Sequence, residues 1–495
     1  MKTVLSVDLG AGSGRVIAAF FDGSSLRTET VSRFSNDPVE IGGHIYWNFP
    51  GLLRDIRAGL AAAAAKFGPV ASVGVDSWGV DYGFLDKGGR LLGLPCAYRD
   101  ARNCPANTAR AFEALGRRAL YDETGIQFID FNTVFQLFAE RAEPSPLLDR
   151  AERMLFIPDL VNWALCGEAA NEATDASTSG MVSLETRDWS PRILSALGIA
   201  PGGLLRTPVR PGARLGAVRG VPGLENVPVI AVGSHDTASA VAAVPAAEGG
   251  DWAYLATGTW ALLGIETPEP MRGDAPYELN WTHEGAANGQ FRFLKNCTGM
   301  WMVQELRRAW TAEDGGAAPE WDDLMHAAEA SAPFRTLVDP DWAPFQSPGG
   351  MPAKIAGFAR LTGQPVPETR GEFYRAAMEG VVMRYREVWG ELRSITGVRR
   401  GLLHVIGGAT RDAMHCRMAA DALDARLVCG PDEGAATGNA IAQLVGLGDL
   451  SGFAEGRDLV RRSVRLSEWA PENPAPWAEA FPRWLAAKRA AAAAV

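Results

Sequence analysis

The sequence has no long apolar run, which bears on membranes and on export. No run reaches the roughly 18 residues that a membrane-spanning helix needs, and the alanine-rich runs at 60–65 and 490–495 are far shorter. The apolar start, MKTVLSVDLG, is broken by Asp8 and lacks the longer apolar region and the small-residue cleavage site of a signal peptide. We therefore expect a cytoplasmic protein with no membrane partner.

Cysteine, histidine and positive charge are also scarce. The six cysteines form no C-x-x-C pair, and the six histidines show neither H-E-x-x-H nor H-x-x-E-H spacing, so neither a zinc site nor a disulfide framework is indicated. With 48 Lys and Arg against 58 Asp and Glu, the net charge of −10 argues against a nucleic-acid partner. A nucleotide ligand is not excluded, because a few backbone N–H groups and basic side chains can hold its phosphates.

What the sequence does contain is an alternation of apolar strands and helical segments. At 495 residues, with 47% hydrophobic and 21% charged residues, it fits two or three globular domains. We expect strands at 4–8, 16–21, 71–76, 227–232, 252–256, 260–265 and 402–406, and helices at 52–67, 134–142, 147–165, 236–244, 370–395 and 435–445. The strand–turn–strand pattern of the first twenty residues recurs at 252–265. This pattern predicts an α/β protein whose two domains have similar cores.

The first turn, Asp8-Leu9-Gly10-Ala11-Gly12-Ser13-Gly14-Arg15, favours phosphate binding. Small residues let successive N–H groups converge on an anion, Arg15 adds a charge-assisted bond, and Asp8 suits Mg²⁺ held through water. The Walker pattern is absent, and the Rossmann pattern needs a glycine where Arg15 stands and a helix where we expect a strand. An ordinary glycine-rich hairpin turn remains the alternative.

Two later turns have a similar character. Thr257-Gly258-Thr259 lies between two apolar strands, and Gly407-Gly408-Ala409-Thr410 joins a strand to a helix. Together with the first turn they suit a nucleotide, with phosphate near small residues and the ribose or adenine against the glycine pair. A second ordinary hairpin and a plain helix-start turn remain the alternatives.

Asp236 is the candidate general base. It follows the strand at 227–232 in Gly233-Ser234-His235-Asp236-Thr237, and a carboxylate is basic enough to accept a hydroxyl proton that leaves late in phosphoryl transfer. The simpler alternative makes Asp236 or Thr237 the N-cap of the next helix. His235 is either a sugar contact or a structural histidine.

Polyol recognition uses carboxylates, amides and a stacked aromatic ring, and two stretches offer such groups. Asp76-Ser77-Trp78-Gly79-Val80-Asp81 and Tyr98-Arg99-Asp100-Ala101-Arg102 each combine an aromatic with carboxylates, and Asn296 adds an amide. The alternatives are turn caps, ion pairs and a core tryptophan.

Taken in order, these motifs resemble the FGGY family of carbohydrate kinases. The resemblance runs from residue 3 to about residue 445 and rests on DLGAGSGR (8–15), GVDSWGVDYGFLD (74–86), GLPCAYRDAR (93–102), TGIQFIDFNT (124–133), GSHDTASAV (233–241), YLATGTWALLG (254–264), LKNCTGMW (294–301) and GGATRD (407–412). The SHDTAS, WGVD and YRD-x-R stretches are most similar to the branch that acts on L-rhamnulose.

The resemblance implies two actin-like (ribonuclease H-like) domains with a cleft between them. Residues 1–245 would hold the sugar site and the first phosphate turn, residues 250–445 the ATP site, and residues 446–495 a helical tail. It further implies ATP-dependent phosphorylation of the 1-hydroxyl of L-rhamnulose, with Mg²⁺ as the metal.

Site residues follow from the resemblance position by position. Asp236 matches the proton acceptor, and Asp8 matches the carboxylate near Mg²⁺. The sugar-contacting positions are Gly79, His235, Thr237 and Asn296. The ATP-contacting positions are Ala11, Gly12, Ser13, Gly14, Arg15, Thr259, Gln304 and Gly408.

Two departures and two alternatives accompany this interpretation. Ala409 replaces the third glycine of the adenosine turn, which is tolerable if its φ is negative, and Gly12 replaces a hydroxyl residue. A kinase of L-fuculose, xylulose, ribulose or glycerol is one alternative. An actin-like or chaperone-like ATPase serving assembly or client binding is the other, and Asp236, Asn296 and the WGVD stretch argue against it. The oligomeric state is not predicted.

Overall fold

The computed structural model describes residues 1–143, 147–200, 202–247, 250–398 and 401–494. The chain forms two compact units of mixed α/β structure, each assembled from separate stretches of sequence. Unit 1 comprises Met1–Glu248, Ile265–Leu294 and Glu433–Arg465, and unit 2 comprises Gly249–Gly264, Lys295–Asp432 and Leu466–Val495. The two-domain α/β fold class predicted above is thereby confirmed, while the predicted domain boundaries stay a prediction.

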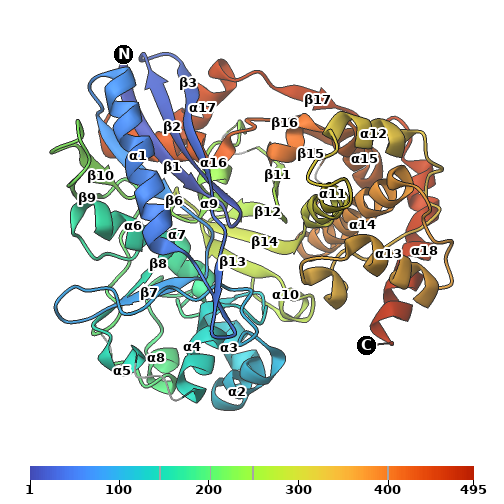
Figure 1. Ribbon diagram of the computed structural model, residues 1–495, viewed down its shortest axis with the longest axis horizontal. Helices are drawn as coiled ribbons and strands as arrows, with labels where there is room; N and C mark the ends of the chain where they lie inside the picture. The colour runs from blue at the N-terminus through green and yellow to red at the C-terminus, as the bar shows by residue number, and fades with distance from the viewer. Residues whose placement is uncertain (144–146, 201, 248–249, 399–400, 495) are drawn as a thin grey trace. The chain divides into compact units, whose positions relative to one another are not determined.

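Unit 1 is built on a six-stranded sheet (Figure 1). Its strands are β1 (Lys2–Leu9), β2 (Ser13–Phe21), β3 (Leu26–Ser35), β6 (Ser72–Asp76), β9 (Arg214–Ala217) and β10 (Pro228–Ile230), in the order β3-β2-β1-β6-β10-β9. Strands β3, β2 and β1 are antiparallel, β1, β6 and β10 are parallel, and β9 is antiparallel to β10. The expected strand after the first glycine turn is therefore present as β2.

Helices cover both faces of this sheet, because β1 is apolar on both sides. Leu5, Val7 and Leu9 pack with α1 (Phe49–Phe67) and α6 (Ile157–Cys166) in one cluster. Val4 packs in another cluster with α16 (Gly434–Gly446). Successive side chains of a strand point to opposite faces, so Asp8 shares the α16 side with Val4.

The rest of unit 1 consists of shorter elements. The further strands are β4 (Val39–Ile41), β5 (His44–Tyr46), β7 (Tyr82–Leu85), β8 (Arg153–Phe156) and β13 (Thr282–Gly285). The further helices are α2 (Pro105–Leu115), α3 (Arg117–Thr124), α4 (Thr133–Ala142), α5 (Leu147–Arg150), α7 (Ala173–Ala176), η1 (Ser177–Ser179), α8 (Pro191–Ala196), α9 (Asp236–Ala242), α10 (Asp274–Glu278) and α17 (Phe453–Ser463).

One predicted helix, 147–165, is wrong. The structure instead has α5, then β8 paired with β7, and then α6. The apolar run 154–157 is fully buried, and a short buried run of this kind fits a strand as well as a helix. Pro158 then starts α6, where its missing N–H costs nothing.

Unit 2 repeats the sheet plan of unit 1. Its strands are β11 (Trp252–Thr257), β12 (Trp260–Thr267), β14 (Phe291–Thr298), β15 (Leu402–Gly407), β16 (Arg426–Cys429) and β17 (Ser467–Trp469), in a sheet of order β13-β14-β12-β11-β15-β16-β17. The strand β13, which forms an antiparallel hairpin with β14, the last residues of β12 and the first of β14 belong to unit 1. Again a hairpin, β11–β12, is followed by two parallel strands and an antiparallel edge strand. The predicted internal repeat is confirmed.

The helices of unit 2 gather around α14 (Arg370–Thr396) (Figure 1). This helix contacts α11 (Trp301–Glu313), α12 (Trp321–Glu329) and α15 (Ala413–Leu423). A capping box between Thr369 and Glu372 starts α14, and Gly397 in the left-handed conformation ends it. Within the described parts of the chain, no helix is both long and apolar enough to cross a membrane. The other helices are η2 (Ala343–Gln346), α13 (Met351–Leu361), η3 (Gly408–Arg411) and α18 (Ala475–Ala492).

Candidate active site

The predicted ATP-contacting run from Ala11 to Arg15 spans the turn between β1 and β2 and the first residues of β2, which begins at Ser13. The N–H of Gly10 donates to the carbonyl oxygen of Ser13 at 2.8 Å. Asn36 holds the turn from the end of β3: its side chain donates to the carbonyl of Gly10 at 3.0 Å and its N–H to that of Gly12 at 3.3 Å. These bonds fix the base of the turn, while Gly12 and Ser13 are exposed.

Arg15 bridges two carboxylates within unit 1. Its Nη2 donates to Asp8 Oδ2 at 2.7 Å, and its Nη1 pairs with Glu433, which Arg33 also contacts at 3.1 Å. The Arg15 side chain keeps 25% of its surface exposed. Its guanidinium is therefore oriented by protein carboxylates before any phosphate binds.

The Asp8 carboxyl is held in an unusual electrostatic setting. Burial raises its pKa to about 6; Arg15 opposes this increase, and the nearby carboxylates of Asp236 and Glu433 add to it. A buried carboxylate among other carboxylates is a site where a cation relieves repulsion.

Asp76, which the sequence offers as a sugar-site carboxylate, is a neighbour of Asp8. The two residues are register partners at the ends of the parallel strands β1 and β6. Asn439 of α16 donates to Asp76 Oδ2, whereas Asp76 Oδ1 is buried with no hydrogen-bond partner. Burial, followed by the charge of Asp8, raises the pKa of Asp76 well above its usual range.

Asp236 is the first residue of α9, and the loop before it connects this helix to β10. His235 occupies the N-cap, and no side chain caps this helix, so the simpler alternative for Asp236 and Thr237 does not hold. The Asp236 carboxylate accepts a hydrogen bond from Thr237 Oγ1 at 3.0 Å and keeps 31% of its side-chain surface exposed. Its backbone N–H donates to the Ser77 carbonyl at 2.8 Å, which fixes Asp236 to the end of β6.

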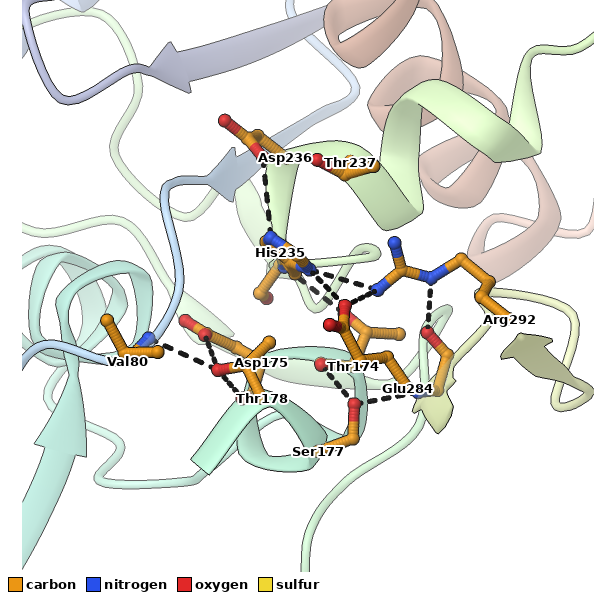
Figure 2. A network of polar contacts seen from close by, with 12 residues as sticks. Val80, Thr174, Asp175, Ser177, Thr178, His235, Asp236, Thr237, Glu284 and Arg292 are labelled. Carbon is orange, nitrogen blue, oxygen red and sulfur yellow. Dashed lines mark hydrogen bonds and ion pairs between the residues drawn. The ribbon is translucent and has the colours of Figure 1, made fainter. Parts of the chain in front are cut away.

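His235 lies between Arg292 and Asp236 (Figure 2). Its Nδ1 is 2.9 Å from Arg292 Nη2, and its Nε2 is 3.7 Å from Asp236 Oδ1. Glu284 contacts the same Arg292 nitrogen at 2.9 Å. Arg292 and Glu284 come from β14 and β13, and no local motif singled them out.

Gly79 lies in the loop after β6, beside a tight approach of backbone and side chain. A Cβ at this position would meet Thr178 Oγ1 at 2.8 Å, and the N–H of Val80 donates to that oxygen at 3.1 Å. Asp81, which the sequence offered as a second sugar carboxylate, is fully buried and accepts from Trp47 and other donors instead. Its role is structural.

The second charged stretch, 98–102, is also structural for the most part. Arg102 forms an ion pair with Glu140 at 2.8 Å, with both side chains nearly buried. Asp100 accepts from the backbone of Ile45 at 2.7 Å. The ion-pair alternative stated above therefore describes these residues.

Unit 2 holds the remaining predicted residues. Thr259, in the β11–β12 turn, donates to Gln304 Oε1 of α11 at 3.3 Å, so these two predicted ATP residues lie together. Gly408 begins η3 directly after β15, and Asn296 lies in β14. Ala409 is not among the residues with positive φ, which meets the condition set for this departure.

The residues present suit a hydrated magnesium ion. Among the described residues, no three His, Cys, Asp or Glu side chains form a ready-made metal cage. Asp8, Asp76 and Asp236 nevertheless supply hard oxygen atoms that influence one another electrostatically, and one Asp76 oxygen has no partner. Mg²⁺ keeps much of its water shell, so a few carboxylates are enough for it.

Known proteins match this chain along nearly its whole length. The FGGY family of carbohydrate kinases matches with its N-terminal domain over residues 3–243 and its C-terminal domain over residues 253–447. A rhamnulokinase of Bacteroides thetaiotaomicron is 39% identical over 484 residues, covering 97% of this chain and 98% of that protein. A rhamnulokinase of Pectobacterium atrosepticum is 36% identical over 488 residues, covering 98% and 96%.

Solved structures of other kinases share the fold. Ligand-bound xylulose kinase from Lactobacillus acidophilus has a TM-score of 0.81 at 16% identity, covering 100% of this chain and 99% of that one. Plasmodium falciparum glycerol kinase with ADP has a TM-score of 0.77 at 16% identity, covering 99% and 98%. Together with the full-length relatives, these matches lead to one conclusion: the chain belongs to the FGGY family of carbohydrate kinases and is an ATP-dependent carbohydrate kinase.

Proposed function

We propose that this kinase transfers the γ-phosphoryl group of ATP to the 1-hydroxyl of L-rhamnulose, giving L-rhamnulose 1-phosphate and ADP. The substrate comes from the relatives named rhamnulokinase, which match along nearly the whole chain. The observation that carries the reaction is the carboxylate of Asp236, which caps no helix, stays partly exposed and lies beside His235.

In the proposed reaction, Asp236 is the general base. It accepts the proton of the 1-hydroxyl while that oxygen forms a bond to the γ-phosphorus and the bond from that phosphorus to the β-phosphate oxygen breaks. The transition state is loose, so the proton leaves late and a carboxylate suffices. Gly79, His235, Thr237 and Asn296 contact the sugar in this proposal.

The nucleotide contacts are proposed on both units. Ala11, Gly12, Ser13, Gly14 and Arg15 would contact ATP from unit 1, and Thr259, Gln304 and Gly408 from unit 2. Gly12 and Ser13 of the first turn are exposed residues, and backbone N–H groups in such a turn suit phosphate oxygens. Asp8 would hold Mg²⁺ through water, with Asp76 and Asp236 nearby, and the ion would neutralise charge that develops on the phosphates.

The test is ADP release with Mg²⁺-ATP across L-rhamnulose, L-fuculose, both xyluloses, both ribuloses, glycerol and no sugar. We expect the highest kcat/KM with L-rhamnulose, and ³¹P-coupled carbon NMR of the product should place the phosphate on C1. A higher kcat/KM with another ketose or polyol would overturn the proposed substrate. Release that no sugar stimulates would overturn the proposed reaction as a whole.

A further inference from the structure

A buried arginine approaches the proposed sugar-contacting histidine from the side opposite to Asp236. Arg292 has no exposed side-chain surface, and its Nη2 lies 2.9 Å from Nδ1 of His235 (Figure 2). The other ring nitrogen, Nε2, lies 3.7 Å from Asp236 Oδ1, too far for a direct hydrogen bond. The imidazole thus has one nitrogen occupied by protein and one directed toward the proposed base.

The chemistry of the two partners decides which ring nitrogen carries the proton. A guanidinium has only donors, so a nitrogen 2.9 Å from it must offer a lone pair. Glu284 Oε2 lies 3.3 Å from the same Nδ1, farther away, and accepts from Arg292 Nη2 at 2.9 Å. The closer contact therefore makes Nδ1 the acceptor and leaves the proton of the neutral ring on Nε2.

Arg292 is itself held in a fixed orientation. Its Nε donates to the carbonyl of Gly285 at 2.9 Å, while Nη2 serves both Glu284 and His235. The backbone of Gly285 is itself held in place, because its N–H donates to Ser177 Oγ at 2.7 Å. The planar guanidinium is thus aligned by three contacts, which is the arrangement that a lysine could not reproduce.

The backbone of His235 is tied to the same region. Its N–H donates to Thr174 Oγ1 at 3.2 Å, and Ser177 Oγ donates to the Thr174 carbonyl at 2.6 Å. The β13–β14 hairpin and the N-terminus of α9 are therefore joined through one short segment (Figure 2). The histidine and the arginine that faces it are held by the same frame.

We propose that Arg292 is a positioning residue that fixes His235 in the Nε2–H tautomer, so that the imidazole donates a hydrogen bond to an oxygen of the ketose next to Asp236. The proposal rests on the proposed function for the ketose itself. The ketose oxygen that accepts this bond keeps its own proton or a second lone pair for other groups. The His235 donor and the Asp236 base therefore act on neighbouring positions without competing. The opposite tautomer would present a lone pair to the substrate and lose this donor.

The first test needs no substrate. Long-range ¹H–¹⁵N NMR of histidine side chains distinguishes protonated from unprotonated ring nitrogens, and the chain has only six histidines. The His235→Ala variant identifies the signal that disappears. We expect a protonated Nε2 and an unprotonated Nδ1 for His235 in the wild-type protein. A protonated Nδ1 would overturn the proposal, whatever sugar the enzyme prefers.

The second test is a mutant cycle. Arg292→Met together with Glu284→Leu removes the donor, adds no new one beside Nδ1 of His235 and leaves no buried unpaired charge. With the ketose that the wild type phosphorylates best, we expect the ketose KM to rise about 5- to 10-fold, which is the loss of one hydrogen bond, and the ATP KM to stay within twofold. In the His235→Ala background the same pair of changes should have no further effect on the ketose KM.

A matched control separates positioning from stability. Arg102→Met with Glu140→Leu removes another nearly buried ion pair of unit 1 and should lower the melting temperature without changing the His235 signal. The proposal would be overturned if the changes at Arg292 and Glu284 raised the ketose KM equally in the wild-type and the His235→Ala backgrounds. If no sugar is phosphorylated by the wild type, the proposed function fails, and the NMR result alone decides whether Arg292 sets the tautomer.

Discussion

The two glycine-containing hairpins occupy the same place in their sheets but end in different chemistry. In unit 1, β1 and its parallel neighbour β6 end in the register pair Asp8 and Asp76. In unit 2, β11 and its parallel neighbour β15 end in the register pair Thr257 and Gly407. One sheet thus concentrates carboxylates at its strand ends, whereas the other brings two backbones together without charge.

The two turns are also held differently. Arg15 links the first turn to Asp8 and Glu433 by ion pairs. In the second turn, the N–H of Gly299 donates to the Thr259 carbonyl at 3.1 Å, and that of Met300 to the Gly258 carbonyl at 2.9 Å. The two hairpins therefore share a backbone plan and differ in the residues at their turns. We expect unit 1 to be sensitive to lost charge and unit 2 to added bulk.

Between the two hairpins, the largest loss of stability is expected where bulk is added to unit 2. Gly407 has a φ of +98°, and a Cβ there would lie 2.3 Å from the Thr257 carbonyl oxygen. Gly407→Ala should therefore cost about 3 kcal/mol, seen as a clear fall in melting temperature. Gly12→Ala is the matched control, since nothing lies within 4 Å of its Cβ position, and it should change stability by less than about 1 kcal/mol. Equal stability of the two variants would contradict the contrast.

Removing charge from unit 1 should cost activity and increase stability. Asp8→Asn should lower kcat/KM for Mg²⁺-ATP about 10- to 100-fold, as loss of a carboxylate that holds a metal through water would. The same variant should be more stable at pH 7 by at most about 3 kcal/mol, because burial raises the pKa of Asp8 from 3.8 to about 6 and so penalises its ionised form in the folded state.

The sign of this stability effect can be checked with pH. The folded protein binds the Asp8 proton more tightly than the unfolded chain, so wild-type stability should recover as pH falls from 7 through about 6 toward 4. The advantage of Asp8→Asn in melting temperature should shrink over the same range. An advantage that grows as the pH is lowered would contradict the raised pKa.

A smaller effect is expected from the neutral contact of the second turn. Thr259→Val removes a hydroxyl that donates to Gln304 at 3.3 Å and that we propose contacts ATP. The ATP KM should rise about 3- to 10-fold, with the ketose KM unchanged. Initial rates at varied ATP and fixed ketose measure this, and a shift in the ketose KM alone would show that the turn is misassigned.

The smallest effect is expected at the departure in the adenosine turn. Ala409 is nearly buried and lacks a positive φ, so its methyl group needs no unusual backbone. Ala409→Gly should leave the ATP KM within twofold and lower stability by about 0.5–1 kcal/mol. Tighter ATP binding by fivefold or more would show that the methyl group obstructs the nucleotide.

Local patterns were enough to predict the hairpins. Apolar strands around Gly10–Gly14 and around Gly258 show both the strands and the turns, and the strand before Asp236 places that residue at a helix start. The segment 147–165 was misread because a fully buried strand has no alternation to reveal it. Sequence reasoning succeeded where a pattern is local and failed where burial hides it.

The parts of the site that sequence could not predict depend on distant pairings. Glu433 contacts Arg15 although 418 positions separate them in the sequence, and Arg292 contacts His235 at a separation of 57 positions. Neither pairing follows from spacing, because each depends on which strands and helices become neighbours. Asp76 is recognisable in the sequence as a strand-end carboxylate, but only the β1–β6 register places it beside Asp8.

The turnover of Asp236→Asn, with the ketose that the wild type phosphorylates best, tests directly whether Asp236 accepts the proton. Asparagine keeps the shape of the side chain and cannot accept the proton. We predict a fall in kcat of about 10²- to 10⁴-fold, with ATP affinity in a direct binding assay within about threefold of wild type. Turnover close to that of the wild type would contradict the account, because it would remove Asp236 from the proton transfer.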